Sequence, residues 1–177
     1  MLKRCFSALL YHLSELEVYV QPPGSVTPLR NWYLQMEKVS FGRDSHFSRG
    51  LIIYKGFNIS IGERASVGEH SMLHAHGKIS IGNDFLAAPG LTINSGGHDV
   101  ISMKPYAATV TIGDRVWCGV NVTILPGVTV GNDVVLGAGS VVNKDIPSSV
   151  VAAGNPTRII RNIDRTQVQL WQWRQDK

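Results

Sequence analysis

Apolar residues in the second half of the chain recur at every sixth position. The first series is apolar at each step: Ile112, Cys118, Ile124, Val130, Leu136 and Val142. A second series, four residues further along each cycle, is mostly aliphatic: Val116, Val122, Val128, Val134, Ser140 and Ile146. Glycine follows the first series in most cycles: Gly113, Gly119, Gly131 and Gly137. A period of six is neither the period of two of an alternating strand nor the 3.6 of an amphipathic helix.

The same cycle occurs earlier in the chain, at Phe41-Gly42, Ile61-Gly62, Val67-Gly68 and Ile81-Gly82. Its starts at 41, 61 and 81 lie 20 residues apart, and those at 112 and 130 lie 18 apart, which is three hexapeptides. These spacings predict an all-β fold, a parallel β-helix whose coils have three short flat sides and bury apolar residues in a continuous column. The alternative, a β-sandwich of short strands joined by glycine turns, would show strands that alternate with period two.

One interval in this repeat is longer than the others. From Ile81 to Ile112 the chain runs 31 residues, 13 more than a coil of 18, and the excess falls around residues 95–109. This excess predicts an irregular loop, containing His98 and Asp99, on an otherwise rigid scaffold. Loops whose roots are held by regular structure commonly carry binding and catalytic residues. The loop is therefore the first candidate for a functional site.

The segments on either side of the repeat follow other patterns. Apolar residues with helical spacing predict an amphipathic helix over residues 2–17: Leu2, Phe6, Leu9, Leu10, Leu13 and Leu16. We expect this helix to cover the open end of the β-helix, with binding to a membrane surface through Lys3 and Arg4 as the alternative. The segment QPPGSVTP is typical of a linker, and DRTQVQLWQWRQDK predicts a C-terminal helix. The predicted division is an N-terminal helix and linker (1–40), a β-helix with its loop at 95–109 (41–150), and a tail with a helix (151–177).

Composition narrows the class of protein. A chain of 177 residues with 44% hydrophobic and 17% charged residues is typical of a single globular domain. It holds no run of 18 apolar residues, and its signal-peptide-like start is interrupted by His12, Glu15 and Glu17, so we expect that start to be retained. Two cysteines form no disulfide framework, which favours the cytoplasm. The net charge of +4 is scattered along the chain, which argues against nucleic-acid binding.

One long segment combines the repeat with a distinctive tail: IGDRVWCGVNVTILPGVTVGNDVVLGAGSVVNKDIPSSVVAAGNPTRIIRNI. On this segment the chain resembles the hexapeptide-repeat acyltransferases, and within them the sugar and polysaccharide O-acetyltransferases. The resemblance covers the repeats at residues 41–147 and extends through AAGNPTRIIR to Arg161. It implies a left-handed β-helix, a homotrimer with sites between subunits, and acetyl-CoA as the acyl donor. The spacing of the repeat does not by itself determine the hand of the coil.

The resemblance also implies a mechanism. In similar enzymes the histidine of this loop is the catalytic base, and His98 is the matching residue. An imidazole titrates near pH ~6.5, so it can take a proton from a hydroxyl at neutral pH. Asp99 is a candidate to orient His98, as in a triad, or else to bond to its own turn. Cys118 raises the alternative of a covalent acyl-enzyme, but its place in the inward series predicts a buried and inert thiol, so we expect direct transfer.

Five residues match positions that bind the donor in similar enzymes: Ala138, Asn143, Lys144, Arg158 and Arg161. The resemblance implies that the small side chain of Ala138 lets the pantetheine arm pass close to the backbone. It also implies that the cationic residues contact phosphates, for which arginine is well suited. The alternative for the arginines is an ordinary basic surface. Asn143 stands where the family has a threonine, and Val120 where some relatives have a serine, so the hydroxyl contacts at those positions are not expected.

The segment GEHSMLHAH brings three further histidines close together: His70, His74 and His76. Gamma-class carbonic anhydrases share this fold and bind zinc through histidines, but no histidine follows His98 here, so we expect no metal. His74 is expected to face outward, toward either the acceptor or solvent. The sequence does not name the acceptor. A hydroxyl of a sugar or polysaccharide precursor is the first expectation; the alternatives are N-acetylation of an amino sugar or small xenobiotic, and a scaffold without catalysis.

Overall fold

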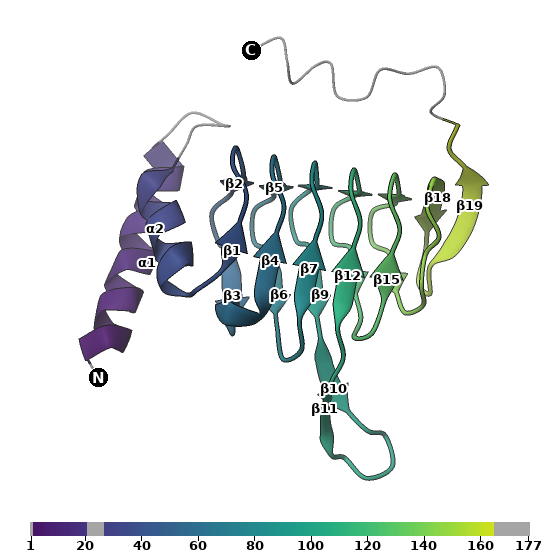
Figure 1. Cartoon of the computed structure of the whole chain (residues 1–177), viewed down its shortest axis with the longest axis horizontal. Coiled ribbons are helices and arrows are strands. Elements are labelled where there is room, and N and C mark those ends of the chain that lie inside the picture. The colour runs from purple at the N-terminus through teal and green to yellow at the C-terminus, as the bar shows by residue number, and fades with distance from the viewer. Residues whose placement is uncertain (1, 21–26, 165–177) are drawn as a thin grey trace.

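The computed structural model describes residues 2–20 and 27–164 of the chain. Within these ranges two helices, α1 (Leu2–Val20) and α2 (Pro28–Met36), stand at one end of a solenoid built from three sheets (Figure 1). The chain visits each sheet in turn and then returns to the first, so neighbouring strands in a sheet come from successive coils. The parallel β-helix predicted from the period of six is confirmed. The predicted C-terminal helix lies outside the described residues.

Each sheet collects one side of every coil. The first sheet contains β1 (Ser40–Phe41), β4 (Ile59–Ile61), β7 (Ile79–Ile81), β12 (Val110–Ile112) and β15 (Thr129–Val130). The second contains β2 (His46–Phe47), β5 (Ser66–Val67), β8 (Leu86–Ala87), β13 (Trp117–Cys118), β16 (Val135–Leu136), β18 (Val150–Ala153) and β19 (Arg158–Asn162). The third contains β3 (Ile52–Tyr54), β6 (Met72–His74), β9 (Thr92–Asn94), β14 (Thr123–Ile124) and β17 (Val141–Val142).

Two elements depart from the regular coil. A short 3-10 helix, η1 (Gly56–Asn58), fills the corner after β3. The predicted loop is an antiparallel hairpin of β10 (Gly96–His98) and β11 (Pro105–Ala107), which projects away from the solenoid (Figure 1). The chain leaves the third sheet at Asn94 and re-enters the first sheet at Val110. The hairpin therefore replaces one ordinary corner between these two sheets.

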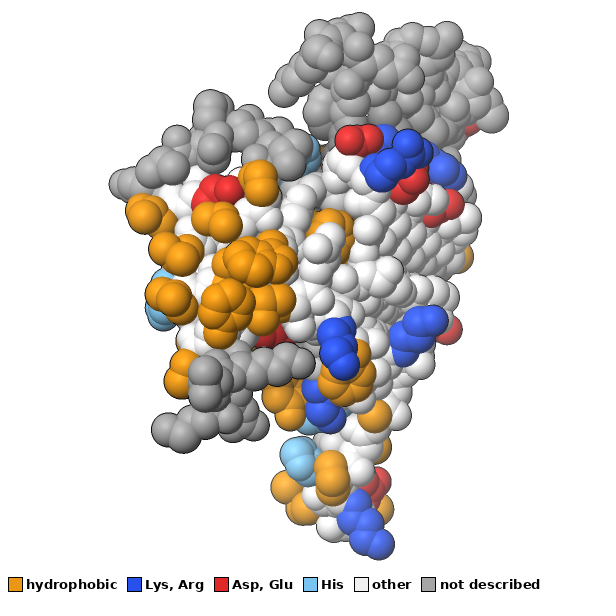
Figure 2. Space-filling model, turned by 60° about the vertical axis from the view of Figure 1, so that its left-hand side comes forward, with side chains coloured by type: hydrophobic (Ala, Val, Ile, Leu, Met, Phe, Trp, Pro, Cys, Tyr) orange, Lys and Arg blue, Asp and Glu red, His pale blue; other side chains and the backbone are white. Residues whose placement is uncertain are grey.

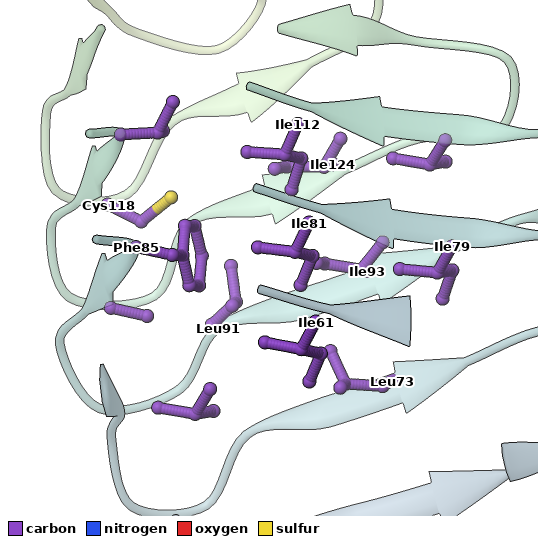
Figure 3. Packing of buried hydrophobic residues seen from close by; sticks show 14 of the residues in the cluster. Ile61, Leu73, Ile79, Ile81, Phe85, Leu91, Ile93, Ile112, Cys118 and Ile124 are labelled. Carbon is purple, nitrogen blue, oxygen red and sulfur yellow. The ribbon is translucent and has the colours of Figure 1, made fainter. Parts of the chain in front are cut away.

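The core is a column of inward side chains from all three sheets (Figure 3). Phe41, Ile61, Ile81, Ile112 and Val130 stand in register along the first sheet. Both six-residue series are buried throughout the second half, as predicted. Burying one such aliphatic side chain contributes about 1.5–3 kcal/mol. A single coil would leave its inward face exposed, so stacking of coils stabilises the fold.

Cys118 belongs to this column. It is fully buried, and burial raises the pKa of its thiol to about 12. The thiolate, which is the nucleophilic form, is therefore strongly disfavoured. The prediction that Cys118 is a core residue is confirmed.

The glycine after each inward residue has a steric cause. A Cβ on Gly62 would lie 2.6 Å from Oδ1 of Asn83 and 2.7 Å from the backbone carbonyl carbon of Gly82. That Asn83 oxygen accepts a hydrogen bond from the backbone N–H of Glu63 at 2.9 Å. The motif of an apolar residue, glycine and then Asn or Asp thus lets a side chain of each coil bond to the backbone of the coil before it. The left-handed φ angle at this corner belongs to a later residue, such as Arg64 at 56°.

The N-terminal end of the solenoid is covered by α1 and α2. Glu15 pairs with Arg30 and accepts a hydrogen bond from the backbone N–H of Gly50 at 2.8 Å, which ties α1 to the first coil. Glu17 accepts from the backbone N–H groups of Leu29 and Arg30, at the N-terminus of α2. An acidic side chain stabilises a helix at that end. The sequence analysis assigned residues 1–40 one helix and a linker, so α2 is an element that it missed.

The outer face of this cap is apolar. Five large side chains are 45–59% exposed: Phe6, Leu9, Leu13, Leu16 and Trp32. Figure 2 shows apolar side chains gathered over the two helices. In the described ranges, no helix has the length and apolar character needed to cross a membrane.

The solenoid continues past residue 150, where the sequence analysis placed the start of the tail. β18 pairs in parallel with β16, and β19 then turns back and pairs antiparallel with β18. Residues 150–162 therefore extend the second sheet. Arg158 lies opposite Ala153, and Arg161 lies opposite Val151.

Candidate active site

The root of the hairpin is fixed by two polar side chains. Oδ1 of Asn94 accepts a hydrogen bond from the backbone N–H of Gly96 at 3.0 Å, which turns the chain out of β9. Ser95 is fully buried, and its hydroxyl accepts from the backbone N–H of Gly77 and donates to the Gly77 carbonyl, both at 2.9 Å. The hairpin is thus held to the preceding coil before it leaves the solenoid.

The two glycines that follow make room for aromatic rings. A Cβ on Gly96 would lie 2.5 Å from Cβ of His76. A Cβ on Gly97 would lie 2.9 Å from Cζ and the hydroxyl oxygen of Tyr106, its partner across the hairpin. Each residue of the segment NSGG therefore has a structural role in positioning the next residue, His98.

His98 ends β10, lies opposite Pro105 and is exposed. Within the described residues its imidazole makes no hydrogen bond or ion pair with any of the five expected donor-binding residues. The ring stands on a hairpin whose root is held by hydrogen bonds, and because it is open to solvent it is accessible to a substrate hydroxyl. The geometry is compatible with a general base.

Asp99 is engaged in the hairpin turn. Its Oδ1 accepts hydrogen bonds from the backbone N–H of Ser102 at 2.7 Å, from the Ser102 hydroxyl at 2.7 Å, and from the backbone N–H of Ile101 at 3.2 Å. These bonds lower the pKa of the Asp99 carboxyl, with the backbone N–H of Ser102 the largest cause. The geometry favours the turn role over the orientation of His98, which stays a prediction.

Beside the hairpin root lies a cluster of rings that the sequence analysis recognised only in part. Tyr54, His74 and Asn94 stand in register across β3, β6 and β9. Ring centroids of Tyr54 and His74 are 4.5 Å apart, those of Tyr54 and His76 are 5.0 Å apart, and those of the two histidines are 4.9 Å apart. His74 is half-buried and faces outward, as predicted, and His76 is exposed. Tyr54 precedes His74 by 20 residues, the length of one early coil. Its place beside the histidines becomes visible only when β3 pairs with β6.

The pKa of His76 is lowered, first by desolvation and then by the positive charges of Lys55, His74 and His98. Charged groups influence one another in this way only at short range. The ring cluster and His98 therefore share one region of the surface. In the parts of the chain that the structure covers, no group of three or more His, Cys, Asp or Glu side chains is placed to hold a metal ion.

Three of the expected donor-binding residues lie at two corners of the solenoid, and the two arginines lie on β19. Ala138 is exposed where the chain passes from the second sheet to the third, and its backbone packs against Gly119 of the preceding coil. Val120 lies beside it and is 44% exposed. Asn143 and Lys144 are exposed after β17, at the corner from which the hairpin emerges two coils earlier.

Arg158 and Arg161 are both exposed on β19. The guanidinium of Arg158 donates to the Thr157 carbonyl, and that of Arg161 to the Asn162 carbonyl, each at 3.3 Å. Trp117, which the sequence analysis missed, is 47% exposed on the outer side of the second sheet, opposite Leu86 and Val135. Its exposure could have been predicted from the hexapeptide pattern, because Trp117 directly precedes the inward residue Cys118 and neighbouring strand residues point to opposite sides.

Repeat, solenoid and projecting hairpin together define a hexapeptide-repeat β-helix with one inserted arm. A family described as bacterial transferase hexapeptide (six repeats) matches residues 109–144. Galactoside O-acetyltransferase of Escherichia coli K12 is 40% identical over 130 residues, which are 71% of this chain and 57% of that protein. The chain thus spans little more than half the length of this relative.

Two solved structures match over more of their length. A maltose O-acetyltransferase from Clostridium difficile 630 has a TM-score of 0.72 and 31% identity, covering 92% of this chain and 87% of that one. A galactoside acetyltransferase in complex with coenzyme A has a TM-score of 0.75 and 32% identity, covering 92% of this chain and 81% of that one. The chain belongs to the hexapeptide-repeat acetyltransferase family, as the sequence resemblance implied.

Proposed function

We propose that the chain is an acetyl-CoA-dependent O-acetyltransferase that acts on a hydroxyl of a sugar or polysaccharide precursor. Family membership supports the reaction, and the relatives named for galactoside and maltose support a saccharide acceptor. The observation that carries the proposal is the hairpin, which holds His98 exposed at a fixed place beside a polar surface. Two cysteines that form no disulfide fit a reducing compartment, the cytoplasm, where acetyl-CoA is available.

His98 is the general base of this mechanism. Its imidazole accepts the proton of the acceptor hydroxyl, and the oxygen attacks the thioester carbonyl of acetyl-CoA. The tetrahedral oxyanion is stabilised by a backbone N–H of the adjoining subunit. The C–S bond then breaks, and the proton passes from His98 to the departing CoA thiolate. Acetylated acceptor and free CoA are the products, and the enzyme returns to its starting state.

Five residues bind the donor in this proposal. Lys144, Arg158 and Arg161 contact the phosphates of CoA, and Ala138 lines the path of the pantetheine arm. Their side chains are exposed. Within residues 2–20 and 27–164 the two guanidiniums donate hydrogen bonds only to neighbouring carbonyls, so both groups can turn toward a ligand. Asn143 offers an amide beside Lys144.

We infer that the protein works as a homotrimer with sites shared between subunits. Within one copy, the hairpin projects away from the solenoid and His98 makes no hydrogen bond or ion pair with the described donor-binding residues. The hairpin tip is apolar, with Val100 89%, Ile101 91% and Met103 67% exposed. Apolar side chains this exposed are typical of an interface. If a second copy covers the tip, His98 of the first copy lies against the donor-binding residues of the second copy.

Release of the CoA thiol tests the function. The purified protein is incubated with acetyl-CoA and galactosides, maltose, uronic acids or amino sugars, and free thiol and acetylated product are measured. The proposal expects thiol release that depends on an acceptor hydroxyl, with an O-acetyl ester as the product. Acetylation confined to amines would contradict the proposal and assign N-acetylation instead. A protein that does not bind CoA would contradict it in favour of a scaffold without catalysis.

A further inference from the structure

The two residues that lengthen the early coils lie at the corner between the third and first sheets. They follow β3 and β6, in the segments that contain Lys55 and His76, and the hairpin leaves the solenoid from the same corner one coil later. Coils of 18 residues do not have these segments. Lys55 and His76 of these segments lie together with Tyr54 of β3 and His74 of β6 in a local surface, the corner cluster, beside His98.

The corner cluster is held in place by packing. His74 lies in register with Tyr54 on one side and Asn94 on the other. His76 packs against Gly96 at the hairpin root, and its ring meets both Tyr54 and His74. The Lys55 ammonium lies 5.5 Å from the centroid of the Tyr54 ring. Two imidazoles and one ammonium thus converge within reach of a single small ligand.

The positive charge of the corner cluster is not offset by an acid of the described residues. The charged groups that act on His76 are all basic: Lys55, His74 and His98. Among the described residues, none of the ion pairs includes a member of the corner cluster, whereas arginines elsewhere on the solenoid pair with acids of the next coil, as Arg115 does with Asp133 at 2.8 Å. Asp99 keeps its charge within its own turn, and it is not among the groups that shift the pKa of His76. The uncompensated ammonium of Lys55 attracts an anion, and a bound anion in turn favours protonation of the neighbouring imidazoles.

We propose that the acceptor carries an acidic group, a carboxylate or phosphate, beside the hydroxyl that is acetylated, and that Lys55, His74 and His76 bind that group. The inference rests on the proposed acetyl transfer and names the class of its acceptor. An anion in the corner cluster receives charge-assisted hydrogen bonds from the ammonium and from protonated imidazoles. A neutral sugar offers no negative charge to the ammonium of Lys55. Lys55, His74 and His76 are specificity-determining residues, and His98 remains the base.

Matched acceptors test this inference. The kcat/KM of acetylation is measured for glucose against glucuronic acid, galactose against galacturonic acid, and glucose against glucose 6-phosphate. The expected result is a preference for the acidic member of at least one pair, and this preference falls with ionic strength because salt screens exposed charges. A carboxylate preference and a phosphate preference distinguish the two acids. Equal or faster acetylation of every neutral member overturns the inference but leaves the proposed function intact.

Substitutions locate the preference. Lys55→Gln, and the double variant His74→Asn with His76→Asn, keep hydrogen-bonding groups but remove positive charge. Each is expected to lower the acid-to-neutral ratio of kcat/KM by about tenfold, with the KM for acetyl-CoA unchanged. Arg43→Gln, which removes an 83% exposed cation at a different corner, is the control and is expected to leave the ratio unchanged. A ratio that stays constant in both cluster variants overturns the inference.

Binding without turnover separates the two proposals. Histidine resonances of the whole protein are followed by NMR while glucuronate or inorganic phosphate is added. An anion in the corner cluster stabilises the charged imidazole, so the pKa of His76 is expected to rise with ligand in the wild type and not in Lys55→Gln. This result with no acetyl transfer would reject the proposed function and leave an anion site. Unchanged histidine titration with active acetyl transfer would reject the anion site alone.

Discussion

At the scale of single residues, close approach between coils explains the glycines of the repeat. Gly62, Gly82 and Gly113 have ordinary φ angles, and each faces an Asn or Asp side chain of the next coil. Gly119 instead faces the backbone of Ala138. The sequence analysis predicted a column of inward apolar residues correctly because a period of six depends on side-chain polarity alone. It did not reveal the close approach that excludes a Cβ, because the opposing side chain belongs to the next coil, as Asn83 does for Gly62.

Gly62→Ala is expected to lower the free energy of unfolding by about 1–3 kcal/mol, since a methyl group would overlap Asn83 and the backbone of Gly82. Thermal or urea unfolding measures this. The matched control is Gly139→Asn, at a position with a left-handed φ of 69° and no atom within 4 Å of the place that a Cβ would take. Asn121 holds the equivalent corner one coil earlier with φ of 55°, so the control should cost less. Equal losses would reject the steric explanation.

Substitutions of Asp99 distinguish its two candidate roles, which are to stabilise the hairpin turn or to orient His98 as the acid of a triad does. Asp99→Asn keeps an oxygen that can accept from Ile101 and Ser102, whereas Asp99→Ala removes it. Because the carboxylate serves the turn, we expect Asn to retain kcat within a few-fold and Ala to lose more. A loss of roughly 10⁴-fold in the Asn variant, as a triad acid would give, would assign Asp99 the orienting role instead. Steady-state kinetics with a saturating acceptor decides between them.

At the scale of elements, the local sequence pattern predicted individual strands and helices less completely than it predicted the buried residues. The inserted loop was placed correctly by counting residues, but its pairing as β10 and β11 was not, because three-residue strands carry too little alternation. Helix α2 was missed because its first residue, Pro28, is also the last residue of the linker-like segment QPPGSVTP. The proline stands in the first turn of the helix, where it is tolerated, and the cap comes from Glu17 in another helix.

The apolar hairpin tip is the element through which the proposed trimer can be tested. Val100→Ser combined with Ile101→Ser is expected to weaken the trimer, because each apolar side chain removed from a contact costs about 1.5–3 kcal/mol. Sedimentation velocity over a dilution series measures the change, and circular dichroism checks that the solenoid is intact. Phe57→Ser, at a side chain that is 65% exposed on η1, is the comparison. A stable and active monomer in the wild type would contradict shared sites.

At the scale of the whole molecule, the expected donor-binding residues are spread over the solenoid. Asn143 and Lys144 lie at the corner from which the hairpin emerges, two coils further on, whereas Ala138 lies at another corner and the two arginines on β19. No pattern in one chain reveals how copies meet. The roles of Lys144, Arg158 and Arg161 came from resemblance, and the structure adds that these side chains are exposed. The acceptor side was the least predictable, since Tyr54, Lys55 and His76 come together only when coils of 20 residues stack beside the hairpin.

Arg158→Ala and Arg161→Ala are expected to raise the KM for acetyl-CoA and leave the acceptor KM nearly unchanged. A charge-assisted hydrogen bond to phosphate is worth about 1.5–3 kcal/mol, and less at a site open to water. The penalty should shrink with a donor that lacks the 3′-phosphate, if one of these arginines contacts that group. An effect confined to the acceptor KM would move the arginines to the other half of the site.

The central claim is that His98 accepts the proton of the acceptor hydroxyl, and His98→Ala tests it most directly. Turnover with the best acceptor, CoA affinity by calorimetry and mass by light scattering are measured on the same preparation. The account predicts that turnover falls by about 10²–10⁴-fold, because general-base catalysis supplies that factor, while CoA affinity and the trimer are retained. A variant that acetylates its acceptor at nearly the wild-type rate would contradict it.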